Sequence, residues 1–191
     1  MPHAAPDAVA RSGFPNIYAS LAAGTLLEAY GAAADRVTRA LDGLTESELR
    51  AHPIPAKWSI HEIVLHLADS ETVGAVRFRK VVSESFPDLP AYDEKAWAVS
   101  FGYGDRDASF RRAALHTFRN LRETALALFQ TASPSDWKRQ GRHSEWGPVT
   151  LRELLELYAD HGERHLEQIV ARRRLLGRPG EPAPLLPVRL Y

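Results

Sequence analysis

Two histidines near the C-terminal end of the chain have the spacing of a metal site. His161 and His165 are four residues apart, so on a helix their side chains lie one above the other on one face. Two imidazoles in this arrangement can reach one ion, as in helical zinc motifs. Because the chain contains no cysteine, any transition metal must be held by nitrogen and oxygen ligands.

The helix that carries this pair is predicted to run to about Leu176. A capping box at residues 150–153 begins it, and Gly177 suits its end. Both histidines fall on its apolar face, where an imidazole costs free energy unless its nitrogens find partners. A metal would satisfy both rings, a neighbouring carboxylate would also do so, and the spacing arises by chance as well. The face consists of Leu151, Leu154, Leu155, Tyr158, Gly162 and Ile169.

A third histidine, His66, lies at the edge of the apolar face of an earlier predicted helix. That helix follows a capping box at residues 59–62 and extends to about Ser85. Facing helices of a bundle commonly supply ligands to one metal. Three nitrogen ligands leave a coordination position open, which is typical of a catalytic site. The sequence alone does not show whether His66 faces the other pair.

Two further amphipathic segments complete the predicted fold. Apolar residues spaced by three and four predict helices over about 17–41 and 107–131. A capping box at residues 45–48 predicts a short helical turn between the first two long helices. We therefore expect an all-α protein, a four-helix bundle with long connecting loops. The aromatic connection at residues 87–106 is typical of a packed lid over a pocket.

We expect three regions along the 191 residues. Residues 1–16 form an N-terminal leader, 17–176 the bundle, and 177–191 an extended Pro-rich C-terminal tail. The apolar side chains of the tail are expected to pack on the domain or on a second subunit, so a homodimer is a hypothesis. These tail residues are Leu185, Leu186, Val188, Leu190 and Tyr191.

The composition excludes several classes of partner. Basic and acidic residues balance at 24 each, which gives no electrostatic attraction to nucleic acid. No stretch approaches the roughly 18–20 apolar residues that a membrane span needs, and the N-terminus lacks the pattern of a secretory signal. We expect a cytoplasmic protein that acts on a small molecule.

The motifs together resemble the DinB/YfiT-like superfamily of metalloenzymes. The resemblance lies in KWSIHEIVLHLADSE at 57–71, PAYDEKAWA at 90–98, GPVTL at 147–151 and YADHGERHLEQI at 158–169. It spans residues 57–176 in the order of the family.

The resemblance implies a metal site with one ligand from the second long helix and two from the fourth. Matched residue by residue, these are His66, His161 and His165. Some thiol-dependent relatives have a carboxylate in place of one histidine, so this chain resembles the three-histidine branch. Zinc and nickel are the expected ions, with iron and manganese as alternatives.

Two chemistries and one non-catalytic role are open. Relatives suggest a thiol-dependent S-transferase, in which the metal activates a low-molecular-weight thiol of the bacillithiol or mycothiol type. The alternative is a metal-dependent hydrolase. The third hypothesis is a non-catalytic, stress-related bundle protein. Candidates for a general acid or base, or for support of a ligand ring, are Glu71, Tyr92 and His143.

Overall fold

The computed structural model describes residues 18–180, 182, 183, 185 and 186. The expected leader at residues 1–16 lies outside this part of the chain, as do Val188, Leu190 and Tyr191 of the tail. Within the described residues, no helix combines the length and the apolar character that crossing a bilayer requires.

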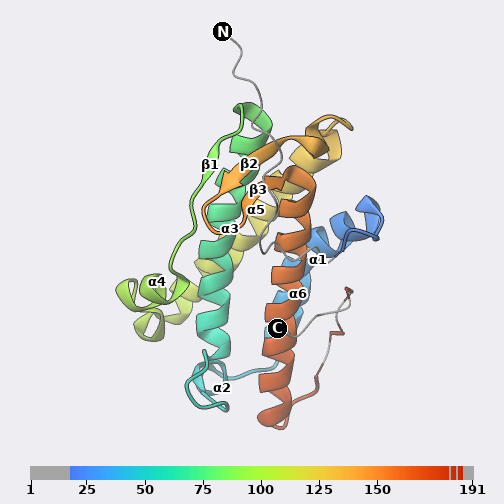
Figure 1. Cartoon of the computed structure of the whole chain (residues 1–191). Helices are drawn as coiled ribbons and strands as arrows, with labels where there is room; N and C mark the ends of the chain where they lie inside the picture. The colour runs from blue at the N-terminus through green and yellow to red at the C-terminus, as the bar shows by residue number, and fades with distance from the viewer. Residues whose placement is uncertain (1–17, 181, 184, 187–191) are drawn as a thin grey trace.

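Four long helices form the body of the molecule (Figure 1). They are α1 (Ala23–Leu41), α3 (Ile60–Ser83), α5 (Ala108–Thr131) and α6 (Leu151–Leu175). Both α1 and α3 pack against α5 and α6, so α1 lies diagonally opposite α3 although the two are consecutive long helices. The prediction of a four-helix bundle is therefore confirmed.

The observed helix ends show which local sequence signals were sufficient to predict where a helix begins. All three predicted capping boxes are present, with Thr45, Ser59 and Thr150 each accepting a hydrogen bond from the backbone three residues on. The one clear difference is the start of α1, which was predicted at residue 17. The N-cap residue, Ala22, has no side chain that can cap a helix, so the sequence carries no signal for the observed start.

The long connections contain more regular structure than predicted. A small sheet, which periodicity did not predict, joins β1 (Asp88–Leu89) in parallel to β2 (Gln140–His143). β2 also pairs with β3 (Gly147–Thr150) in an antiparallel hairpin. Its strands are too short for an alternating pattern to appear. The remaining elements are α2 (Glu46–Arg50), α4 (Glu94–Ser100), η1 (Tyr103–Asp105) and η2 (Asp136–Lys138).

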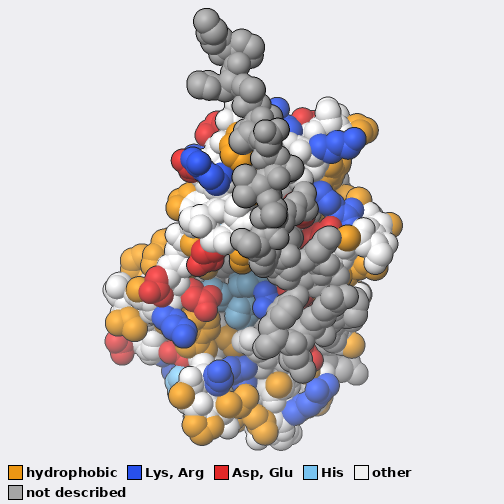
Figure 2. Space-filling view, viewed as in Figure 1, with side chains coloured by type: hydrophobic (Ala, Val, Ile, Leu, Met, Phe, Trp, Pro, Cys, Tyr) orange, Lys and Arg blue, Asp and Glu red, His pale blue; other side chains and the backbone are white. Residues whose placement is uncertain are grey.

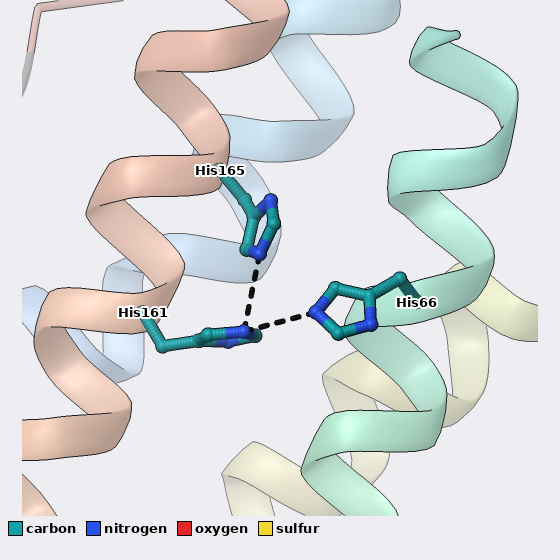
Figure 3. Close-up of side chains that lie close together, drawn as sticks. All are labelled: His66, His161 and His165. Carbon is teal, nitrogen blue, oxygen red and sulfur yellow. Dashed lines mark hydrogen bonds between the residues drawn. The ribbon is translucent and has the colours of Figure 1, made fainter. Parts of the chain in front are cut away.

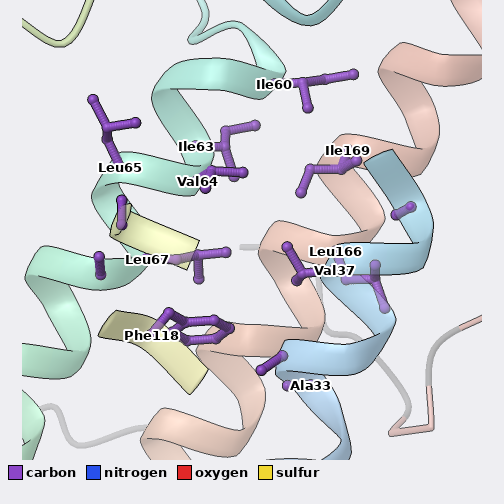
Figure 4. Packing of buried hydrophobic residues seen from close by; sticks show 14 of the residues in the cluster. Ala33, Val37, Ile60, Ile63, Val64, Leu65, Leu67, Phe118, Leu166 and Ile169 are labelled. Carbon is purple, nitrogen blue, oxygen red and sulfur yellow. The ribbon is translucent and has the colours of Figure 1, made fainter. Parts of the chain in front are cut away.

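The core has two clusters of buried apolar side chains. One lies toward the sheet and includes Tyr30, Phe78, Phe129 and Tyr158, and Leu186 of the tail packs into it. The second lies between α3 and the C-terminal half of α6 (Figure 4), and its members include Ile63, Val64, Phe118, Leu166 and Ile169.

A buried arginine, Arg122, lies where the two clusters meet. Its Nε donates to Glu71 of α3 at 2.8 Å, and its two other nitrogens donate to the backbone carbonyls of Tyr30 and Tyr158 at 2.9 and 2.7 Å. The guanidinium also lies over the rings of Tyr30 and Phe118. One side chain of α5 thus contacts the other three long helices.

Gly162 on α6 makes room for this arginine. A Cβ atom at this position would lie 3.0 Å from both terminal nitrogens of Arg122, closer than a carbon normally approaches. The absence of a side chain at Gly162 therefore allows α6 to pack against the guanidinium.

We expect Glu71→Gln to lower the free energy of unfolding by about 3–5 kcal/mol, because it leaves the buried guanidinium without its counter-charge. Urea unfolding of both proteins at neutral pH measures the difference. The matched control is Asp35→Asn, which removes the acid of the partly exposed Arg119–Asp35 pair between α5 and α1 and should cost less than about 1 kcal/mol. Equal effects of the two substitutions would contradict a structural role for the Arg122–Glu71 pair.

Candidate metal centre

Three histidines from two neighbouring helices point toward one another (Figure 3). His66 lies on α3, and His161 and His165 lie one turn apart on α6. The His66 and His165 rings are buried, whereas His161 is partly exposed. The ring of Trp58 packs on His66 with 4.7 Å between centroids. The structure thus brings together the three residues that the sequence predicted as ligands.

The ring nitrogens of these histidines have the spacing of ligands to one ion. Nε2 of His161 lies 3.0 Å from Nε2 of His66 and 3.1 Å from Nε2 of His165. Nitrogens bound to a common ion at about 2.0–2.1 Å lie about 2.9–3.4 Å apart in octahedral or tetrahedral geometry. Among the described residues, no carboxylate forms a hydrogen bond with the three rings. The residue types and their spacing therefore fit a divalent transition ion.

The three imidazoles are held in the neutral form that binds a metal. Burial lowers the pKa of His66 to about 4. Burial is also the main cause that lowers the pKa of His161 and His165 well below the usual range, and the nearby histidines and Arg164 add to it. Because a metal ligand must offer a free lone pair, neutral rings favour binding of a cation at neutral pH.

Glu94 is the acidic residue nearest to this cluster, and it carries no sequence signal of its own. Its Oε2 atom lies 3.7 Å from Nε2 of His66, and its side chain is 49% exposed. Asp93 caps α4 by accepting hydrogen bonds from the backbone N–H groups of Lys95 and Ala96, and this fixes Glu94 in the first turn. The cap predicts where α4 begins, but not that this helix lies beside His66.

A cavity of about 520 Å³ opens beside the histidines. Figure 2 shows histidine side chains at the bottom of a hollow in the surface, with acidic and basic side chains beside them. The cluster is therefore accessible from solvent on one side. The polar and aromatic residues that line the cavity are Lys57, Trp58, Glu94, Lys95, His165, Gln168 and Arg172.

Glu71 does not support a histidine ring, contrary to the prediction from its position on the core face. One of its carboxylate oxygens accepts from Arg122 and the other from the hydroxyl of Tyr30. Burial raises the pKa of Glu71, and Arg122 opposes this rise. The helical periodicity placed Glu71 in the core correctly but could not show which partner it meets there.

Tyr92 lies in the segment before α4. Its ring packs on Trp97 with 4.8 Å between centroids, and it lines a second hollow together with Glu94 and Lys95. Burial is the main cause that raises the pKa of Tyr92, and the charge of Glu94 adds to it. The hydroxyl is therefore protonated at neutral pH and can donate a hydrogen bond.

His143 belongs to the small sheet and not to the histidine cluster. Its ring stacks on Trp146 with 4.2 Å between centroids, and its Nδ1 accepts a hydrogen bond from the backbone of Glu145. Burial, with a smaller contribution from Arg77, lowers its pKa to about 4. These contacts describe a packed structural histidine.

The chain is similar to known proteins over most of its length. The sequence profile of the DinB superfamily matches residues 29–169. A protein of Bacillus subtilis named "Putative metal-dependent hydrolase YfiT" is 29% identical over 143 residues, which are 74% of this chain and 79% of the relative. A protein of Oceanobacillus iheyensis that is also named a putative metal-dependent hydrolase is 29% identical over 114 residues, 60% of this chain and 64% of its own length.

A solved structure shares the fold. It is YfiT from Bacillus subtilis, described as a probable metal-dependent hydrolase with an unusual four-helix bundle topology. It superposes with a TM-score of 0.76 at 25% sequence identity, covering 83% of this chain and 91% of that chain.

We expect the structural role of His143 to appear in the pH dependence of stability. The pKa of His143 is about 4 in the folded protein and about 6.5 in an unfolded chain. Protonation therefore favours the unfolded state, and the protein loses stability as the pH falls below about 6.5. Between pH 7 and pH 5, the wild type should lose up to about 2 kcal/mol more than His143→Gln. Urea unfolding at both pH values gives this difference. The control His116→Gln, at an exposed position on α5, should lose as much stability as the wild type does. An identical pH dependence for His143→Gln and wild type would contradict the assignment.

Proposed function

The chain belongs to the DinB superfamily, as its motifs predicted, and we propose that it is a metal-dependent hydrolase with one ion held by His66, His161 and His165. The observation that carries the proposal is the convergence of three Nε2 atoms within 4.8 Å of one another. The names of the relatives from Bacillus and Oceanobacillus support hydrolysis as the reaction class.

Three protein nitrogens leave room for a further ligand, which is the arrangement of catalytic metal sites. When bound, a divalent transition ion supplies Lewis-acid chemistry, polarising a carbonyl or phosphoryl oxygen and acidifying a water molecule. Imidazole ligands suit zinc and nickel. The cavity of about 520 Å³ beside His165 has the size of a site for a small molecule.

Glu94 is our candidate for moving the proton. Its carboxylate lies 3.7 Å from His66 and lines the same cavity as His165, so Oε2 faces both the histidine cluster and the space where a substrate would lie. A carboxylate in this place can accept a proton from the attacking water and return it to the leaving group. Trp58 packs on the ring of His66.

The S-transferase that the family resemblance suggested has no support from the names of the relatives. It remains testable because the two reactions differ in one requirement: an S-transferase needs an added thiol, whereas a hydrolase does not. The non-catalytic hypothesis predicts no turnover under either condition.

We expect protein purified without a metal-affinity column to contain about one transition ion per chain, and His161→Ala to contain almost none, because two nitrogens hold an ion far more weakly than three. Metal analysis of the purified proteins measures this. Circular dichroism should show that the helical content of the variant is retained, since its two apolar clusters do not include His161.

The matched control is His116→Ala, which removes an exposed histidine of α5 and should leave the metal content unchanged. Full metal content in His161→Ala would show that the cluster is not the binding site.

We expect Glu94→Gln to lower turnover by about 10²–10⁴-fold, because the amide cannot accept a proton, while the metal content stays at the wild-type level. The assay uses a panel of chromogenic esters, amides and phosphate esters, with and without an added low-molecular-weight thiol. The control Glu123→Gln removes an exposed carboxylate of α5 and should have no effect.

Turnover without thiol supports the hydrolase, and turnover that requires both thiol and metal supports the S-transferase instead. Wild-type activity in Glu94→Gln would remove this residue from the mechanism.

A further inference from the structure

Arg172 is a buried cation without an acidic partner, and it lines the cavity beside the histidines. The residue is only 4% exposed. Its Nε donates to the carbonyl of Trp58 at 2.6 Å and its Nη1 to the carbonyl of Gln168 at 2.8 Å. Among the described residues, Nη2 has no hydrogen-bond partner, and no carboxylate forms an ion pair with the guanidinium.

A buried arginine is usually stabilised by an ion pair with a carboxylate, and Arg172 has no such pair among the described residues. Arg122 is an example of the usual case, because the Glu71 carboxylate lies 2.8 Å from it and neutralises its charge. Glu62 forms no ion pair with Arg172 in the described structure, because its carboxylate instead accepts hydrogen bonds from the backbone and hydroxyl of Ser59. Burying a charge without a partner is costly, so a counter-charge from outside the described residues would stabilise this side chain.

The position of Arg172 relates it to the histidine cluster. It follows His165 by seven residues on α6, so the two lie on one face, two turns or about 10 Å apart along the axis. Both residues line the same cavity.

The remaining charges of the cavity wall are mostly positive. Lys57 and Lys95 line it together with Arg172, and Glu94 is the only acidic residue among the described residues of the lining. This part of the wall therefore has more positive than negative charge, although the whole chain is neutral. Ala56, which also lines the cavity, adopts a left-handed backbone conformation with φ of 57°, a strain that is typical of functional sites.

We propose that this cavity binds an organic oxyanion, a carboxylate or a phosphate monoester, through Arg172, and that the substrate of the histidine centre is a small molecule with such a group. The anionic end lies at Arg172, and the bond that reacts lies several atoms away, next to His165. A guanidinium with one unused edge is suited to such an oxyanion. The assignment of a substrate class rests on the proposed function, whereas the binding of the anion does not.

The test uses three probes of equal chain length: hexanoate, hexyl phosphate and hexan-1-ol. Their dissociation constants are measured by calorimetry on the full chain after a chelator has removed any metal, so that no ion can bind the anion. We expect at least one of the two anions to bind about tenfold or more tightly than the alcohol, because a hydrogen bond to a charged group adds to the shared contacts of the alkyl chain. Tighter binding of hexanoate indicates a carboxylate, and tighter binding of hexyl phosphate indicates a phosphate monoester.

The variant Arg172→Gln should weaken anion binding about tenfold or more and leave the affinity for hexan-1-ol unchanged. The matched control is Arg174→Gln, which removes an exposed charge from the same end of α6 and should bind both anions as the wild type does. If circular dichroism shows that Arg172→Gln is unfolded, the double variant with Lys57→Gln and Lys95→Gln replaces it, with an expected loss of about threefold.

Two results would overturn the proposal: wild-type protein that binds the alcohol as tightly as both anions, or a folded Arg172→Gln that binds the anions as tightly as the wild type. His161→Ala separates this inference from the proposed function. It should lose the metal and keep its affinity for the anions, so a failure of the metal site and a failure of the anion site are seen in different measurements.

Discussion

The buried guanidinium of Arg122 is the constraint on which the arrangement of the helices depends. It is bound by a carboxylate of α3 and by backbone carbonyls of α1 and α6, so a side chain from α5 reaches all three other long helices. A charged group in this position must be fully paired, because a lost partner leaves an uncompensated buried charge. Only a narrow range of helix positions satisfies these bonds at once, which gives the bundle a single packing arrangement.

This constraint also sets the geometry of the histidine centre. On α6, Gly162 directly follows His161, and its lack of a side chain leaves space for the guanidinium. On α3, Glu71 is the partner of Arg122 and lies five residues after His66. The contact that fixes α3 relative to α6 is therefore within about two turns of the ring nitrogens on each helix. Ligand atoms must be placed within fractions of an ångström, and a satisfied ion pair next to the site supplies the rigidity that a cluster of aliphatic side chains alone does not.

The sequence predicted what depends on local chemistry and missed what depends on how distant segments meet. Capping boxes at Thr45, Ser59 and Thr150 placed three helix starts. Periodicity placed His161 and His165 on a core face and His66 at the edge of another. The family motifs added that these faces meet. The partner of Glu71 depends on α5, the sheet depends on pairing of β1 with a strand some fifty residues away, and the position of Glu94 depends on how α4 folds back onto α3. None of these has a signal in the neighbouring residues.

The histidine centre is built as an open site and not as a structural one. A structural metal is enclosed by four protein ligands and is needed for folding. Here three nitrogens converge, one of their rings is partly exposed, and a cavity with charged walls adjoins them. Two apolar clusters and the Arg122–Glu71 pair hold the helices together without any contribution from the histidine rings. Stability thus rests on one group of residues and the proposed chemistry on another. A bound ion would account for three imidazoles at this place, two of them buried, where an unpartnered polar ring costs free energy.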